Sequence, residues 1–159
     1  IEGGEDVKFI ARRLLISASE DIGNANPTAL VLATSTFQAV ERIGMPESRI
    51  LLSQCVVYLA SSAKSNASYM AINAAQSLVQ ETGDLPVPLH LRNAPTSLMS
   101  KLGYGEGYAY DHDAPQGHSN QECMPEGLEG RRIYEPGNNS REQSMRTHLK
   151  SLWKDKYGY

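Results

Sequence analysis

Five side chains that could bind a metal ion lie within one short stretch of the chain: Asp111, His112, Asp113, His118 and Cys123. Histidine, cysteine and carboxylate are the ligands that zinc takes in proteins, so metal binding is the chemistry to consider. Zinc sites usually contain tight ligand pairs such as Cys-x-x-Cys, and this spacing matches none of them. We interpret the stretch as a polar loop whose histidines are solvated or hydrogen-bonded to neighbours, and expect no metal site.

Nucleotide hydrolysis is the second chemistry to consider. It needs a phosphate-binding loop of the form Gly-x-x-x-x-Gly-Lys-Ser/Thr, which the sequence does not contain. The run from Gly103 to Gly107 is glycine-rich, but its third glycine comes one position early for Gly-x-Gly-x-x-Gly and no predicted strand precedes it. We interpret this run as a turn. No Ser-His-Asp or Cys-His arrangement can be asserted, so we expect neither catalytic nor cofactor-binding residues here.

His90 and Arg92 flank Leu91 in a segment that the prolines at 86 and 88 predict to be extended. In an extended segment the two polar side chains point to one side and Leu91 to the other. A functional hypothesis makes them a phosphate- or substrate-binding pair. We favour a structural one, in which they satisfy helix carbonyls or a carboxylate.

The last predicted helix combines basic and aromatic residues, a combination that can bind single-stranded nucleic acid by charge and stacking. Its candidate DNA contacts are Arg146, Lys150, Trp153 and Lys154. The alternative is a solvated basic face with an apolar anchor. The net charge of −3 for the whole chain argues against a dedicated DNA-binding module, although local basic patches remain compatible with it.

Four helical patterns precede residue 83. Apolar residues recur at the spacing of a core-facing stripe from Val7 to Ala18, from Leu30 to Val40 and from Ala67 to Leu78, whereas the segment from Ile50 to Leu59 is apolar around most of its circumference. Asn26 is a candidate N-cap, Gly44 and Gly83 are helix ends, and Pro46 is a candidate start. Short loops favour antiparallel neighbours, so we predict an all-α bundle whose core holds these four helices.

After residue 83 the chain changes character. We predict a short helix from Pro95 to Leu102, an irregular segment from Gly103 to Asn139 whose tyrosines pack over the helices, and a last helix from Ser140. The apolar third helix and the alanine-striped fourth offer more apolar surface than one small bundle can bury, so we expect residues 1–103 to be a helical oligomerisation domain. Residues 104–159 form an irregular wrap and terminal helix packed on the same domain.

The composition is that of a globular domain. The chain has 159 residues, 40% of them apolar, and no apolar run approaches the ~20 residues of a membrane span. Cys55 reads as a small buried hydrophobe and Cys123 has no redox spacing, as expected in a reducing compartment. Because the chain begins with Ile1 rather than Met, we expect it to be a fragment of a longer protein.

Several strings in register resemble one family. They are FIARRLL at 9–15, ASEDIGNANP at 18–27, KSNA at 64–67, PVPLHLRNAPT at 86–96 and GYGEGY at 103–108. Their order and spacing resemble the C-terminal region of replication-associated recombination protein A (RarA, also called MgsA), whose eukaryotic relative is the Werner helicase-interacting protein. The resemblance covers about Gly4 to Tyr134 and weakens in the final helix.

The resemblance implies a AAA+ ATPase related to clamp loaders that acts at stalled replication forks, in the cytoplasm and associated with the nucleoid. It implies a helical part like the clamp-loader collar that assembles a homotetramer, with single-stranded-DNA-binding protein and DNA as partners of the full-length protein and no membrane. ATP and Mg²⁺ would bind the upstream domain, so no catalytic role passes to any residue here. We therefore expect an oligomerisation domain rather than an enzyme, with a DNA- or partner-binding module as the alternative.

Overall fold

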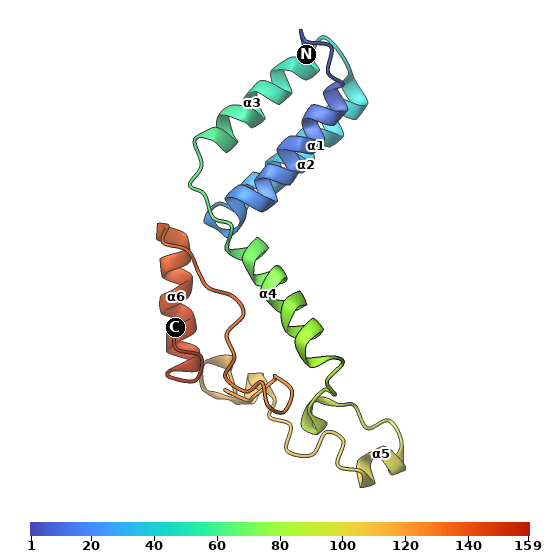
Figure 1. The fold of residues 1–159 in the computed structure, drawn as a ribbon, viewed down its shortest axis with the longest axis vertical. Coiled ribbons are helices and arrows are strands. Elements are labelled where there is room, and N and C mark those ends of the chain that lie inside the picture. Colours follow the sequence, from blue (N-terminus) through green and yellow to red (C-terminus); the bar gives the residue numbers. More distant parts are fainter. The chain divides into compact units, whose positions relative to one another are not determined.

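The structure is a computed structural model that describes residues 1–159, the side chain of Gln116 excepted. Its described residues form helices, turns and irregular segments, without strands. The α-helices are α1 (Val7–Ser17), α2 (Thr28–Ile43), α3 (Ser48–Ala60), α4 (Ala67–Thr82), α5 (Ser97–Lys101) and α6 (Ser140–Trp153) (Figure 1). The predicted all-α class is confirmed. Within the described residues, none of the helices combines the length and apolar composition that a membrane-spanning helix needs.

The chain forms two compact units, each built from two stretches of sequence. The first unit comprises Ile1–Asn73 and Tyr134–Met145, and the second comprises Ala74–Ile133 and Arg146–Tyr159. Helices α4 and α6 therefore each contribute residues to both units. The boundary predicted between residues 103 and 104 marked a change in sequence character, and it stays a prediction.

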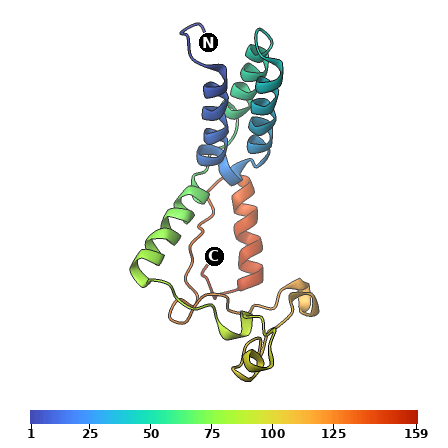
Figure 2. The ribbon, with the colours of Figure 1, turned by 90° about the vertical axis from the view of Figure 1, so that its right-hand side faces the viewer.

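The core of the first unit lies between α1, α2 and α3, which pack against one another (Figure 2). Two hydrophobic clusters fill it, and their buried members are Ala11, Ala18, Ile22, Ala29, Ala33, Val40, Leu52, Cys55 and Leu59. Alanines dominate these clusters, so the helix backbones can approach closely. The core in the structure therefore holds fewer helices than the four predicted. Both clusters are built by α1, α2, α3 and the turn after α1.

The ends of α1 and α2 follow from local chemistry. Asp6 caps α1, because its carboxylate accepts hydrogen bonds of 3.2 Å from the backbone N–H groups of both Lys8 and Phe9. After Ser17 the chain widens into a π-helical turn over Ala18–Ile22. Gly44 ends α2 with a φ of 73°, a conformation that glycine adopts without the steric cost of a Cβ, as predicted.

Two predicted helix starts are wrong. Asn26 does not cap α2 with its side chain, since its Nδ2 donates 3.0 Å hydrogen bonds to the Tyr58 and Ser62 hydroxyls of the α3 region. The Asn26 side chain bonds to these distant residues because it lies opposite the end of α3. The third helix begins at Ser48 rather than at Pro46, and the Ser48 N–H bonds to the Gly44 carbonyl at 3.0 Å.

The second unit holds α5 and much of the irregular segment predicted between Gly103 and Asn139. This segment contains short 3₁₀ turns at Asp111–Asp113 and Pro115–Gly117, so its irregular character is confirmed. The prediction that its tyrosines pack over the helices holds only for Tyr134, whose hydroxyl donates to Glu142 of α6 at 2.7 Å. Tyr108 and Tyr110 are exposed, and Tyr104 stacks beneath Arg92, outside the α-helices, with 5.1 Å between the Arg92 Cζ and the ring centroid.

Candidate functional site

Three of the four predicted DNA contacts lie on α6, and the fourth follows it. Arg146 and Lys150 are four residues apart, which places them one turn apart on the same side of the helix. Lys154 comes directly after the last helical residue, Trp153, and has a left-handed φ of 52°. Lys150 and Lys154 are exposed and Arg146 is partly exposed. Positive side chains therefore lie on α6 and just after it, and the contact with DNA stays a prediction.

Trp153, the fourth predicted contact, is occupied by neighbouring rings. Its centroid lies 4.3 Å from that of His118 and 4.8 Å from that of Tyr157, both in edge-to-face geometry. The Lys156 ammonium lies 5.0 Å from the Trp153 ring centroid. These contacts are of the kind that stabilise packing. Trp153 thus anchors the end of α6, which is the alternative that the sequence left open for it.

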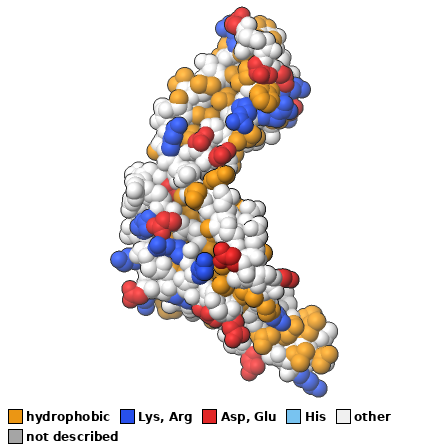
Figure 3. All heavy atoms as spheres, viewed as in Figure 1, with side chains coloured by type: hydrophobic (Ala, Val, Ile, Leu, Met, Phe, Trp, Pro, Cys, Tyr) orange, Lys and Arg blue, Asp and Glu red, His pale blue; other side chains and the backbone are white. Residues whose placement is uncertain are grey.

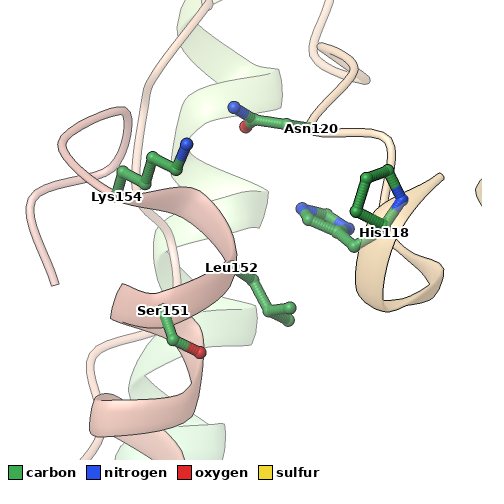
Figure 4. A pocket seen from close by; sticks show the side chains of 6 residues that line it. His118, Asn120, Ser151, Leu152 and Lys154 are labelled. Atoms are coloured by element: carbon green, nitrogen blue, oxygen red, sulfur yellow. The ribbon is translucent and has the colours of Figure 1, made fainter.

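A pocket of about 300 Å³ opens where α6 ends (Figure 4). Its lining residues come from α6, the residues that follow it and the 115–120 loop, and are Pro115, His118, Asn120, Ser151, Leu152 and Lys154. Figure 4 shows the Lys154 ammonium and the Asn120 amide directed toward each other across the pocket, with the His118 ring beside them. The pocket therefore combines an apolar wall with a cation and several hydrogen-bonding groups.

Two features of this pocket are unusual for a surface loop. Asn120 and Lys154 have φ angles of 56° and 52°, and they are the non-glycine residues with left-handed backbone within the described chain. The Nε2 atom of His118 is buried and has no hydrogen-bond partner among the described residues. The Lys156 ammonium donates to the Asn120 carbonyl at 3.1 Å, which fixes the loop against the residues after α6.

The metal-like side chains of the sequence are not gathered into one site. Among the described residues, no group of three His, Cys, Asp or Glu side chains is placed to hold a metal ion. His118 faces Trp153, and the His112 ring lies 5.0 Å from the Tyr110 ring. The Asp111 carboxylate is hydrogen-bonded by the Ser119 side chain and by the Ser119 N–H, the latter at 2.9 Å, and these two bonds lower the pKa of the carboxyl.

His90 and Arg92 form structural contacts rather than a pair. The segment predicted to be extended makes a 3₁₀ turn at Leu89–Leu91, so the predicted alternation of sides is wrong. His90 Nε2 lies 2.8 Å from the Glu122 carbonyl, and Arg92 Nε donates to the Val87 carbonyl at 2.6 Å. The preferred structural hypothesis is supported, although the partners are carbonyls outside the α-helices.

Glu122 joins the loops of the second unit to the residues after α6. Its carboxylate accepts hydrogen bonds from the Met124 N–H at 2.9 Å, the Gly130 N–H at 3.1 Å and the Tyr157 hydroxyl at 2.8 Å. Burial acts to raise its pKa, but these bonds and the Lys156 charge at 3.5 Å outweigh burial and lower the pKa to about 2. Sequence reasoning missed Glu122, because its partners lie up to 35 residues away.

In the first unit, Glu142 likewise joins separate segments through hydrogen bonds to its carboxylate. It is completely buried, and its carboxylate is hydrogen-bonded by Tyr134, Ser65, Asn139 and the Gly137 backbone. Burial acts to raise the pKa of this carboxyl, and the hydrogen bonds outweigh it and lower the pKa. The one signal in the sequence was Asn139 three residues before Glu142, the spacing of a capping box, in which the Asn139 side chain also accepts from the Glu142 N–H.

Large apolar side chains lie on the outside of the first unit. Ile50 and Val57 on α3 are 58% and 65% exposed, and their seven-residue spacing places them on one face of the helix. Phe9 and Ile16 repeat the same spacing on α1, and Val31 of α2 is exposed as well. Figure 3 shows hydrophobic side chains interspersed over the surface of this unit. The apolar third helix thus buries one face and presents another to solvent.

The chain matches the model of a protein family over residues 1–153, and the description of that family is "MgsA AAA+ ATPase C terminal". The match covers the first unit, all of α6 and the second unit except residues 154–159, and so includes the part where the resemblance seen in the sequence weakens.

Named relatives agree with this family. The chain is 49% identical to replication-associated recombination protein A of Coxiella burnetii over 94% of its own length and 34% of the relative's. It is 42% identical to replication-associated recombination protein A of Escherichia coli K12 over 89% of its length and 32% of the relative's. It is 39% identical to ATPase WRNIP1 of Dictyostelium discoideum over 91% of its length and 17% of the relative's. The chain therefore spans about a third, or less, of the length of the curated relatives it matches.

Proposed function

The chain belongs to the family of C-terminal regions of MgsA AAA+ ATPases, which are associated with replication and recombination, and we propose that it holds ATPase subunits together as a homotetramer. The second copy of the chain is the partner of its exposed apolar face. In this function the chain performs no catalysis itself.

The observation that carries the proposal is the large apolar surface that the first unit leaves outside its core. Four alanines and five larger residues fill the space between α1, α2 and α3, while Ile50, Val57 and Val31 stay exposed. Fully burying one such side chain contributes about 1.5–3 kcal/mol, so several of them together can drive association. Extended exposed apolar surface on a soluble protein is typical of an association surface.

The spacing of the exposed residues supports a defined interface. Ile50 and Val57 lie two turns apart on one face of α3, with the exposed polar residues Ser53 and Gln54 between them, and give a neighbouring helix two apolar contact points. Homo-oligomers close by symmetry, so one such surface used by every copy produces a complex of fixed size.

A charge on the exposed face of α3 tests whether this face forms the subunit interface. Val57→Asp places a carboxylate in the proposed contact, and we expect the association of the 159-residue chain to weaken by at least about tenfold in sedimentation measurements. The matched control is Val79→Asp, the same substitution at an exposed helical position of the second unit.

The two variants give opposite expectations. Val79→Asp should assemble like the unmodified chain, and circular dichroism should show both variants folded. Assembly that survives Val57→Asp unchanged, with the unmodified chain associated, would exclude α3 from the interface.

A second candidate function is DNA binding through α6, favoured by Arg146 and Lys150 on one side of the helix and by Lys154 directly after it. Each lysine that contacts a phosphate releases counterions, so binding to a single-stranded oligonucleotide should weaken as salt rises. Charge reversal of Lys150 and Lys154 to Glu should then remove oligonucleotide binding and leave the sedimentation of the chain unchanged. Oligonucleotide binding that persists in the double variant would count against this function.

The remaining roles belong to the full-length protein. We propose that ATP and Mg²⁺ bind upstream of this chain, and that single-stranded-DNA-binding protein is met through the full-length protein at the nucleoid. Hydrolysis of ATP by the 159-residue chain alone would contradict this division of labour.

A further inference from the structure

The pocket at the end of α6 has features that neither assembly nor a plain basic helix requires. We propose that it receives one nucleotide of a single nucleic-acid strand, with the base inside the pocket and the phosphate on Lys154. The proposal deepens the second candidate function, DNA contact through α6, and rests on it. It adds His118, Asn120 and Ser151 to the residues that meet the strand.

The backbone of the pocket is the first argument. Asn120 and Lys154 adopt left-handed φ angles of 56° and 52°, while the other left-handed positions of the described chain are glycines. Residues other than glycine rarely keep this conformation, and where they do they cluster at ligand sites. Both line the same pocket, from two different segments of the chain. Asparagine adopts this conformation more readily than most residues, so Lys154 is the more unusual of the two.

The hydrogen-bonding groups are the second argument. His118 Nε2 is buried with no partner among the described residues, and the Asn120 amide offers one donor and one acceptor side by side. The Ser151 hydroxyl donates to the His148 carbonyl at 2.7 Å and keeps its lone pairs to accept. A nucleobase edge presents donors and acceptors next to each other, and an asparagine amide pairs with adenine in two bonds.

The size of the pocket and the charges around it favour a base over a bare anion as its occupant. The pocket of about 300 Å³ is at the lower end of small-molecule sites, and Leu152 and Pro115 give it apolar walls. The C-terminus of α6 carries the negative end of the helix dipole, which disfavours an anion deep inside. Lys154, with Lys150 one turn earlier on the exposed face, can neutralise a phosphate outside the pocket instead.

The chain provides its own reporter for the test. Trp153 is its single tryptophan, and the ring lies 4.3 Å from that of His118. We would titrate the 159-residue chain separately with deoxyadenosine monophosphate, deoxyadenosine and inorganic phosphate, and follow Trp153 fluorescence and the His118 and Asn120 signals by NMR. We expect saturable changes with the nucleotide, weaker binding of the nucleoside and no response to phosphate at equal concentration. No response to the nucleotide, or an equal response to phosphate, would overturn the proposal.

Glycine variants separate binding from folding. Asn120→Gly and Lys154→Gly keep the left-handed backbone without strain, so we expect an unchanged or higher Tm together with nucleotide binding at least about tenfold weaker. Lys154→Gln removes the proposed phosphate contact and should weaken nucleotide binding. Lys101→Gln on α5 removes another exposed lysine and is the control, which should bind the nucleotide like the unmodified chain. Nucleotide binding that Asn120→Gly leaves unchanged contradicts the pocket.

The outcomes distinguish this proposal from the functions above. If a single-stranded oligonucleotide binds through Lys150 and neither glycine variant weakens it, the pocket proposal fails and DNA contact through α6 stands. If the chain binds neither oligonucleotide nor nucleotide, both fail. Sedimentation of the same samples reports assembly independently of either result.

Discussion

The Tyr134 hydroxyl donates a 2.7 Å hydrogen bond to Oε1 of Glu142, a carboxylate with no exposed surface. The same hydroxyl accepts a 3.2 Å hydrogen bond from the Asn24 side chain, which lies in the turn between α1 and α2. Tyr134 therefore links the start of α6 to the three-helix core through one buried oxygen.

Removing this hydroxyl should destabilise the chain. Tyr134→Phe removes one hydrogen bond from the buried Glu142 carboxylate and one from Asn24, although both keep other partners. We expect a loss of about 1–3 kcal/mol in the free energy of unfolding, measured by urea denaturation. Tyr108→Phe is the control, because Tyr108 is exposed and its loss should change stability by less than about 0.5 kcal/mol. Equal stability of the two variants would show that the buried network does not stabilise the fold.

A methyl group at Gly137 should disturb the same carboxylate. A Cβ at this position would stand 2.7 Å from Glu142 Oε2, which its hydrogen bonds prevent from moving away. We expect Gly137→Ala to cost about 1–3 kcal/mol. Gly3→Ala is the matched control, since a Cβ there meets nothing within 4 Å. The midpoints of thermal unfolding of the two variants give the comparison, and a Gly137→Ala midpoint as high as that of Gly3→Ala contradicts the prediction.

Acid should destabilise the chain through Glu122 and Glu142. Both carboxyls have a folded-state pKa below the ordinary value, and that of Glu122 falls to about 2. Their stabilisation is thus present above the unfolded pKa, near 4.5, and is lost as pH falls toward 2. For Glu122 this amounts to as much as about 3 kcal/mol. Urea denaturation from pH 6 to 3 should show a smaller slope with pH in Glu122→Gln, and an identical slope would disprove the role of Glu122.

The two cysteines should differ in reactivity. Cys55 is fully buried and burial raises the pKa of its thiol, whereas Cys123 is exposed. Because the thiolate is the reactive form, a thiol reagent should modify Cys123 quickly and Cys55 only after unfolding. Mass spectrometry of the native chain should find the label on Cys123 alone. Rapid labelling of Cys55 in the native chain would contradict its place in the core.

The helices could be predicted because their signals are local. The apolar stripe of α1, the break at Gly44 and the proline-rich segment after α4 each depend on a few neighbouring residues. Cys55 in the core followed from the same periodicity. These features need no information about which segments meet in space.

The candidate sites could be predicted only in part, because their contacts join distant residues. The sequence predicted a last helix that carries Lys150, Trp153 and Lys154, and α6 ends one residue before Lys154. It gave no signal that Trp153 would pack against His118, 35 positions earlier. Asn26 is a residue type that often caps a helix, but its side chain donates hydrogen bonds to Tyr58 and Ser62 instead. Long-range hydrogen bonds override a local preference of about 1 kcal/mol, and only the folded structure shows them.

The mass of the chain in solution tests the central claim most directly. Sedimentation equilibrium of the 159-residue chain across the micromolar range should fit a tetramer of the 17.4 kDa chain, with dissociation only on dilution. A single monomeric species at every concentration, up to the highest that stays in solution, would contradict the proposal that this chain holds the ATPase subunits together.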